Sequence, residues 1–114
     1  MARDFRERLA LILELIQMID DRLEDIDYAA FETDRNEIDL TAFRLQVIGE
    51  QCRHLPDHLK TRHDHIPWRA MYAMRNLISH DYGAILPAPI WEVAKGDLDE
   101  LAEICRDELT GDPA

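Results

Sequence analysis

Apolar residues recur every three or four positions along most of this chain, which is the spacing of amphipathic helices. One such helix is expected over residues 5–26 and a second over residues 38–55, where Pro56 ends it. Gly49 lies on the second apolar stripe and permits close approach of a neighbouring helix. The predicted core positions are Leu9, Ile12, Leu13, Ile16, Ile19, Leu23 and Ile26 in the first helix and Ala42, Leu45, Ile48, Cys52 and Leu55 in the second.

Further helical segments are expected after each of these helices. Asp27 can cap a short helical turn that contains Phe31. Pro67 suits the first turn of a third helix, which runs toward Asp81. A fourth helix is expected over residues 90–109. Its predicted inward positions are Val93, Ala94, Leu98, Leu101, Ala102 and Cys105.

Glycines and prolines mark the expected weak points of this pattern. Gly83, Pro87 and Pro89 predict a loop between the third and fourth helices. Gly96 falls inside the fourth helix, where glycine costs about 1 kcal/mol relative to alanine, so a kink or weak point is expected there.

The chain shows no strand-like alternation and no internal repeat. We therefore expect an all-α fold, an antiparallel four-helix bundle with a short additional helical turn, in a single domain over residues 1–114. A domain of this size gains from the extra burial that a homodimer provides. No run of about 20 apolar residues is present and the first residues are charged, so we expect a cytoplasmic protein without a membrane span.

Charge is distributed unevenly. The net charge is −11, yet residues 51–80 hold five basic and two acidic residues and all five histidines. This segment suits either a local RNA cleft or an acidic partner surface, and charge alone does not separate the two. The candidates for contact with RNA phosphates are Arg53, Lys60, Arg62 and Arg69.

The segment Arg75 to Tyr82 carries the candidate chemistry. A histidine such as His80 can move protons near neutral pH, and Arg75 can hold the charge that builds on phosphorus during phosphodiester cleavage. Asn76, four residues before His80, can orient its imidazole. Asp81 is a lesser candidate, because a solvated aspartate at a helix end is the simpler interpretation.

Helical geometry limits how this motif can act. Arg75 and His80 differ by roughly 140° on an ideal helix, so they converge through side-chain reach, through a break near His80, or across a dimer. The alternative for Arg75, Asn76 and His80 is a structural hydrogen-bond network that holds helix ends together.

Several separated signatures together resemble the HepT family, the toxin branch of the HEPN superfamily. They agree in order and spacing over nearly the whole chain. The matching residues are Ile48-Gly49-Glu50, Leu55-Pro56, Ile66-Pro67-Trp68-Arg69, Met74-Arg75-Asn76, His80-Asp81-Tyr82 and Ile90-Trp91-Glu92, preceded by Phe31 and Asp34.

The resemblance implies a small α-helical toxin that cleaves RNA without a metal or other cofactor. It implies Arg75 and His80 as catalytic residues at a dimer axis. It also implies a partner, an MntA-like nucleotidyltransferase antitoxin, which silences the toxin by attaching AMP to Tyr82. Two positions depart from the family pattern, because Gly83 replaces an aromatic residue and Gln51 replaces an alanine.

Two non-enzymatic interpretations stay open beside the ribonuclease. The chain can be a helical binding module that pairs with a nucleotidyltransferase and offers Tyr82 as the acceptor. It can also bind a nucleotide in its basic segment. Cleavage that depends on His80 distinguishes the ribonuclease from both.

The two cysteines, the two tryptophans and the histidines other than His80 have structural explanations. Cys52 and Cys105 are expected to be reduced, buried thiols. A metal site at the pairs His54/His58 or His63/His65 is conceivable, but Pro56 interrupts the first pair and polar loop histidines are favoured. For Trp68 and Trp91, core packing is favoured over stacking on bases.

Overall fold

Every regular element in the described part of the chain, residues 5–74 and 86–111 of a computed structural model, is a helix. This confirms the all-α prediction. In chain order the elements are α1 (Phe5–Leu23), α2 (Tyr28–Glu32), α3 (Arg35–Arg53), α4 (Asp57–Arg62), α5 (Trp68–Ala73), α6 (Pro87–Glu92), the π-helical segment η3 (Val93–Asp97) and α7 (Leu98–Thr110).

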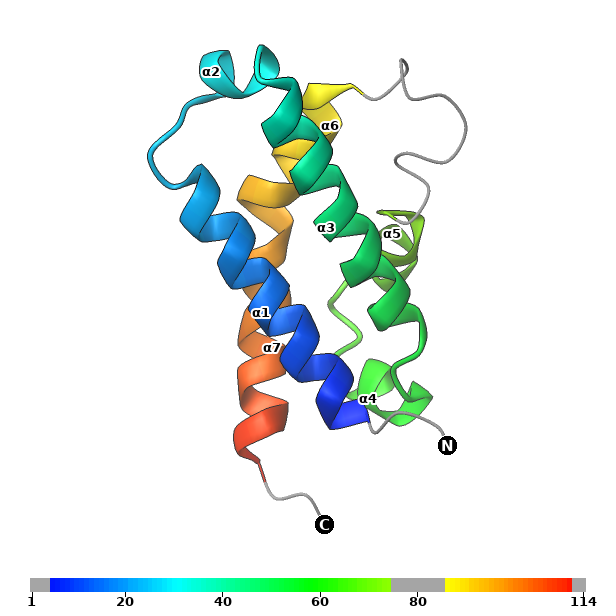
Figure 1. The fold of residues 1–114 in the computed structure, drawn as a ribbon. Coiled ribbons are helices and arrows are strands. Elements are labelled where there is room, and N and C mark those ends of the chain that lie inside the picture. The colour runs from blue at the N-terminus through cyan, green and yellow to red at the C-terminus, as the bar shows by residue number, and fades with distance from the viewer. Residues whose placement is uncertain (1–4, 75–85, 112–114) are drawn as a thin grey trace.

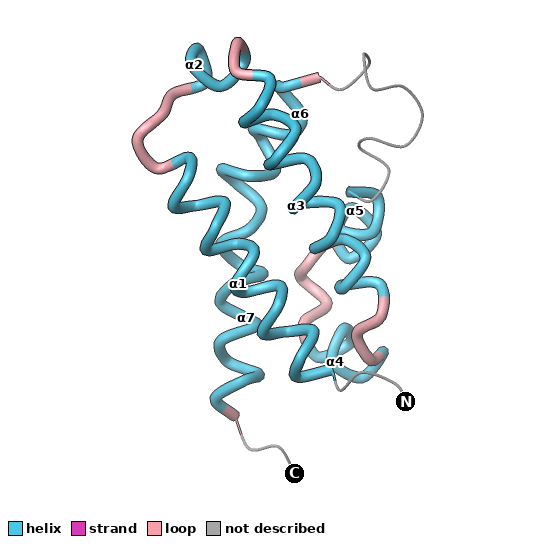
Figure 2. Tube along the Cα trace, viewed as in Figure 1, coloured by secondary structure: helices cyan, strands magenta, loops and turns pink. Residues whose placement is uncertain are grey.

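Three long helical segments form the body of the molecule (Figure 1). They are α1, α3 and the nearly continuous run of α6, η3 and α7. Helix α1 packs against both α7 and α3, and α5 packs against α3. The short helices α2 and α4 lie at opposite ends, next to the turns that Figure 2 shows. This arrangement encloses one continuous apolar core between the three helical segments.

The predicted apolar stripes face this core. In α1 the stripe is buried from Leu9 to Leu23, with Leu13 partly exposed, and in α3 the buried stripe includes Gly49. In the last helical run Val93 is partly buried, while the other predicted inward residues are buried. These are Ala94, Leu98, Leu101, Ala102 and Cys105.

Helix α1 ends at Leu23, three residues before the predicted end at residue 26. The amide of Ile26 turns back to the carbonyl of Leu23 at 3.4 Å. The Nζ of Lys95 also donates to that carbonyl at 2.9 Å. A cation therefore caps the C-terminus of α1, where the helix dipole favours positive charge.

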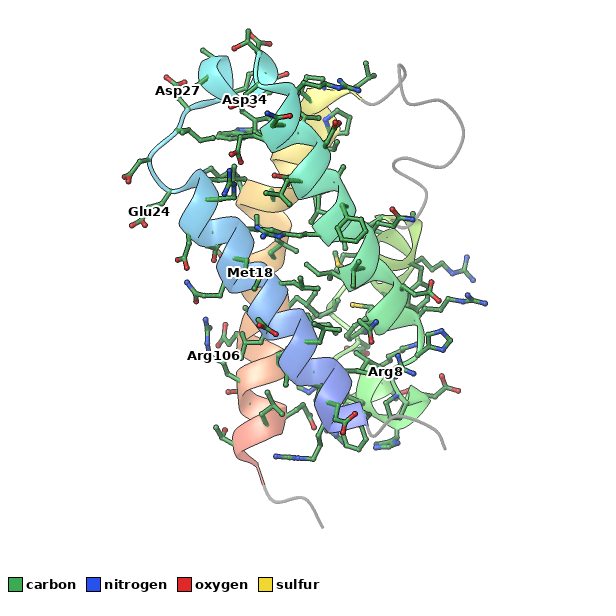
Figure 3. The ribbon with its side chains drawn as sticks, viewed as in Figure 1. Arg8, Met18, Glu24, Asp27, Asp34 and Arg106 are labelled. Atoms are coloured by element: carbon green, nitrogen blue, oxygen red, sulfur yellow. The ribbon has the colours of Figure 1, made fainter. Side chains whose placement is uncertain are left out.

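Two aspartates start the next helices. The Asp27 carboxylate accepts a hydrogen bond from the amide of Ala30 at 2.9 Å, which confirms the predicted cap of α2. The Asp34 carboxylate accepts from the amide of Glu37 at 3.2 Å, so α3 begins at Arg35, earlier than predicted. Figure 3 shows both aspartates at the same end of the molecule.

The sequence pattern missed α4. Pro56 was expected only to end a helix, but it also occupies the N-cap position of α4. Helix α3 itself ends earlier, at Arg53. Leu59 is fully buried, so this six-residue helix is held by its contact with the core rather than by its own length.

The prediction of a loop around Pro87 and Pro89 is partly wrong. Both prolines lie within α6, at its first positions. Proline fits there because the first amides of a helix have no intrahelical acceptor and the ring presets a helical φ.

Gly96 lies in the π-helical segment Val93–Asp97. The structure thus has a local change of helix type at the position where a kink or weak point was predicted. A Cβ added at Gly96 would meet no atom within 4 Å. Neighbouring side chains therefore do not require glycine at this position.

Cys52 and Cys105 are both free and buried, as predicted. Burial raises the pKa of each thiol to about 12, because the thiolate loses its hydration. No helix within the described ranges is long and apolar enough to cross a bilayer.

Candidate functional site

The five motif residues Arg75, Asn76, His80, Asp81 and Tyr82 lie outside the described residues. Their roles stay predictions, as does the continuation of the third helix toward Asp81. The structure does describe the helices that precede and follow the motif, α5 and α6, and the basic residues of the same sequence segment.

Helix α5 leads directly into the motif and is anchored at both ends. At its start, the indole N–H of Trp68 donates to the carbonyls of Lys60 at 3.2 Å and His63 at 3.1 Å. Pro67 is the N-cap, one position earlier than the predicted first turn. At its end, Met71 and Met74 are buried against α3. The chain therefore reaches residue 75 from a helix that is fixed to α3 and α4.

Helix α6 follows the motif and is anchored by Ile90 and Trp91. Ile90 is buried, and the Trp91 ring lies 5.0 Å from Phe31 and 5.8 Å from Tyr28 between ring centroids. Leu86, immediately before α6, is 63% exposed. Because Trp91 and the partly buried Trp68 both pack against the core, the core-packing interpretation holds for both tryptophans.

Lys60 connects three helices on the side where α3, α4 and α5 meet (Figure 1). Its Nζ donates to the carbonyl of Arg53 at 3.1 Å and lies 4.7 Å from the centroid of the Tyr72 ring. The Arg53 side chain is half exposed, with its Nη1 3.7 Å from the Glu50 carboxylate. Arg69 is exposed on α5, three residues before Tyr72 and thus on the same side of that helix.

Arg62 differs from the other three basic candidates. Its Nε and Nη2 donate to the two carboxylate oxygens of Glu108 at 3.0 and 2.9 Å. This hydrogen bonding raises the pKa of Arg62 and lowers the pKa of Glu108, because each charge stabilises the other. The structure thus joins Arg62 to α7, while Arg53, Lys60 and Arg69 remain on the side of α5.

The histidines are distributed among separate contacts. His54 Nε2 lies 3.0 Å from Glu50, and His63 Nε2 lies 2.7 Å from Glu108. The prediction of a loop position is wrong for His58, which lies within α4 and meets the ring of Phe5 edge-on. Among the described residues, no group of three or more histidine, cysteine or acidic side chains is placed to hold a metal.

Two cavities of the described structure are lined by acids. One, of about 410 Å³, lies between α1 and the η3–α7 run and includes Asp20, Asp21, Glu24 and Asp99 around Lys95. Burial, together with the nearby Asp99, raises the pKa of Asp20. The other, of about 270 Å³, is lined by two histidines and three α7 carboxylates. Carboxylates repel phosphates, so neither cavity suits RNA.

Sequence reasoning missed two connecting contacts. Glu108 meets Arg62 and His63 from more than forty residues away, and no local pattern signals such a pair. Gln51 was noted only as a departure from the family pattern. Its amide oxygen accepts a hydrogen bond from Arg8 at 2.9 Å and so links α3 to α1 (Arg8 is labelled in Figure 3).

The structure is that of a small helical protein, and its sequence carries a basic, histidine-rich segment over residues 51–80. The chain belongs to the family described as Ribonuclease HepT-like, whose model matches residues 12–108. This match spans α3, α4, α5 and the motif between α5 and α6.

Curated relatives of this chain are described as probable or putative ribonucleases. A protein of Methanocaldococcus jannaschii described as a gamma-glutamylcyclotransferase and putative RNase is 31% identical over 103 residues, which are 90% of this chain and 46% of that protein. The chain therefore spans about half the length of that relative. The probable ribonuclease HepT of Thermococcus cleftensis is 30% identical over 89% of this chain and 92% of its own length.

A third relative, described as a putative RNase of Methanocaldococcus jannaschii, is 29% identical over 92% of this chain and 90% of its own length. No solved structure gave a significant match to the chain. The relatives and the family model together support a ribonuclease function.

Proposed function

We propose that this protein is a metal-independent endoribonuclease in which Arg75 and His80 carry the chemistry. The observation that carries the proposal is the family match over residues 12–108, because it spans the whole motif. The described structure adds a second support. Helix α5, which leads into Arg75, has cationic side chains beside it on α3 and α4.

The reaction is an internal transesterification. His80 accepts the proton of a ribose 2′-hydroxyl, and the resulting oxygen attacks the adjacent phosphorus. Arg75 stabilises the negative charge of the pentacoordinate phosphorus. The bond to the 5′-oxygen then breaks, that oxygen receives the proton held by His80, and a 2′,3′-cyclic phosphate remains on the upstream RNA. Asn76 orients the imidazole, and Asp81 supports its charged form.

Phosphates on either side of the cleaved bond are contacted by the basic residues near α5. Arg53, Lys60 and Arg69 are available for this role, and each phosphate that a cation neutralises releases counterions. Arg62 is the weakest of the four candidates, because an RNA phosphate would have to displace the Glu108 carboxylate from it.

The proposed regulation acts on the same motif, at Tyr82. In this proposal the protein is the cytoplasmic toxin of a toxin and antitoxin pair, and an MntA-like nucleotidyltransferase inactivates it by AMPylation of Tyr82. AMP on Tyr82, two residues from His80, places bulk and negative charge beside the catalytic histidine. A homodimer with its two-fold axis beside the motif brings two copies of Arg75 and His80 into one groove.

Co-expression with an MntA-like nucleotidyltransferase tests this proposal. Intact mass and peptide mapping of residues 71–95 should find one or more added AMP units on Tyr82, and the modified protein should no longer cleave RNA. Tyr82→Phe should keep cleavage and escape modification. RNA cleavage by purified His80→Ala protein equal to that of the unsubstituted protein would refute the catalytic assignment.

A further inference from the structure

The carboxylate of Glu108 is the meeting point of α4 and α7. Its Oε2 lies 2.7 Å from His63 Nε2 and accepts from Arg62 Nε at 3.0 Å, while its Oε1 accepts from Arg62 Nη2 at 2.9 Å. The side chains of Glu108 and His63 are only 15% and 17% exposed. Partial burial strengthens the contact between Glu108 and His63 relative to one made in open water.

The backbone at the same point is also engaged. Arg6 of α1 donates to the carbonyl of Glu108 at 3.1 Å and to the carbonyl of Leu109 at 2.5 Å. The last turn of α7 therefore joins α1 through its carbonyls and α4 through the Glu108 carboxylate. A displacement of α4 requires that these charged bonds break.

The position of helix α4 determines where α5 begins, because the two are joined by hydrogen bonds. Its six residues are too few for a helix that is stable alone, so its position is set by its contacts, which include buried Leu59, the Lys60 hydrogen bond to the Arg53 carbonyl and the bonds to Glu108. The Trp68 indole, on the first residue of α5, donates to the carbonyls of Lys60 and His63 at the end of α4.

Continuous contacts therefore run from the carboxylate of Glu108 to α5. They pass from Glu108 to the His63 side chain, from the His63 carbonyl to Trp68, and along α5 to the buried Met74. The next residue in the sequence is Arg75. The first contact is a hydrogen bond between the Glu108 and His63 side chains, and the second is a hydrogen bond to a backbone carbonyl. The last step is helix α5 itself, which is packed through Met74.

We propose that Glu108 is a positioning residue for the catalytic motif, which fixes α4 through Arg62 and His63 and thereby fixes α5, the helix that precedes Arg75. The inference rests on the proposed ribonuclease function for its effect on catalysis. It does not place Glu108 in contact with RNA or with the reacting phosphate.

The chain offers a matched control for this test. Glu37 receives the same two-pronged hydrogen bonding from Arg22, at 2.6 to 3.0 Å, between α1 and α3. The exposed fractions of the arginine and glutamate side chains are 52% and 14% in this pair and 50% and 15% in the Arg62–Glu108 pair. Glu108→Gln and Glu37→Gln therefore each remove an arginine–glutamate ion pair of similar exposure, and only the first also changes the contact with His63 and acts on α4.

Steady-state cleavage of one RNA should separate the two variants. We expect Glu108→Gln to lower kcat by roughly ten- to a hundredfold with little change in KM, because a displacement near 1 Å far from the chemistry can have an effect of that size. Glu37→Gln should leave both constants unchanged. Trp68→Phe, which removes the indole N–H donor together with part of the ring volume, should reproduce the Glu108→Gln effect, and the double variant should lose less than the product of the two.

A second measurement keeps the test independent of activity and of simple loss of stability. Nuclear magnetic resonance signals of the His80 imidazole should shift in Glu108→Gln and His63→Gln and stay in place in Glu37→Gln, at a temperature where all variants are folded. If kcat and the His80 signals respond equally to Glu108→Gln and Glu37→Gln, or respond to neither, the inference is wrong. If the unsubstituted protein cleaves no RNA, the proposed function fails, and the His80 signals alone decide the positioning role.

Discussion

Lys60 is the residue whose replacement separates RNA contact from structural support. Lys60→Met keeps most of the apolar stem and removes the ammonium, which donates to the Arg53 carbonyl at 3.1 Å and lies 4.7 Å from the Tyr72 ring centroid. The substitution therefore removes one backbone hydrogen bond, one cation–π contact and one cation from the side of α5.

The structural loss can be estimated from these two contacts. A partly exposed cation–π contact is worth about 0.5–1 kcal/mol, and a hydrogen bond to a carbonyl about 0.5–1.5 kcal/mol. Lys60→Met should thus lower the free energy of unfolding by about 1–2.5 kcal/mol, measured by urea denaturation. That loss leaves a domain of ordinary stability folded at 25 °C.

RNA binding gives the second magnitude. Each phosphate neutralised on a single strand contributes about 0.7 to the slope of log affinity against log salt concentration. We expect Lys60→Met to lower that slope by about 0.7, measured by fluorescence anisotropy of a labelled single-stranded RNA with His80→Ala protein. The matched control is Arg106→Met, which removes an exposed cation from α7 (Figure 3) and should leave the slope unchanged.

An unchanged slope in Lys60→Met would refute the placement of RNA beside α5. Equal reductions in Lys60→Met and Arg106→Met would refute it as well, because the effect would then follow from net charge alone. Urea denaturation of the same samples excludes unfolding as the cause of weaker binding.

Three further predictions concern stability and reactivity. Gly96→Ala should raise the free energy of unfolding by up to about 1 kcal/mol in urea, because alanine favours helix and no atom lies near the added Cβ; a loss would show that the π-helical turn needs glycine. The lowered pKa of Glu108 means that its contribution to stability is complete above the ordinary carboxyl value of 4.5 and is lost as pH falls through the folded value. Acid unfolding of Glu108→Gln should lack that part of the pH dependence, and an unchanged acid profile would contradict the pairing. Cys52 and Cys105, whose pKa values are raised to about 12 by burial, should react with a disulfide reagent far more slowly in the native protein than in urea, and equal rates would contradict their burial.

The long helices were predictable because their signals are local. The stripes of α1 and α3 repeat over five turns, and the Asp27 cap needs only the amide three residues ahead. Helix α4 was not predictable in this way, because a six-residue helix between Pro56 and a turn gains its stability from buried Leu59 and from bonds to α7. Pro87 and Pro89 were misassigned because proline both ends helices and occupies their first turn.

The candidate site shows the same difference between local signals and long-range contacts. Arg75 and His80 could be proposed from the sequence because their chemistry and spacing lie within eight residues. The separation of Arg62 from the other cations could not, because it depends on Glu108, 46 residues away in the chain. Composition showed a basic segment, and only the contact between α4 and α7 shows that Arg62 is held by a carboxylate from a distant part of the chain.

The chemistry of the cleaved ends tests the central claim most directly. Purified protein should be incubated with a single RNA in excess chelator, beside His80→Ala, and the products analysed by mass spectrometry. Fragments that end in a 2′,3′-cyclic phosphate, formed without metal and absent with His80→Ala, are the predicted result. Intact RNA, cleavage that requires a divalent metal, or unchanged cleavage by His80→Ala would contradict the account.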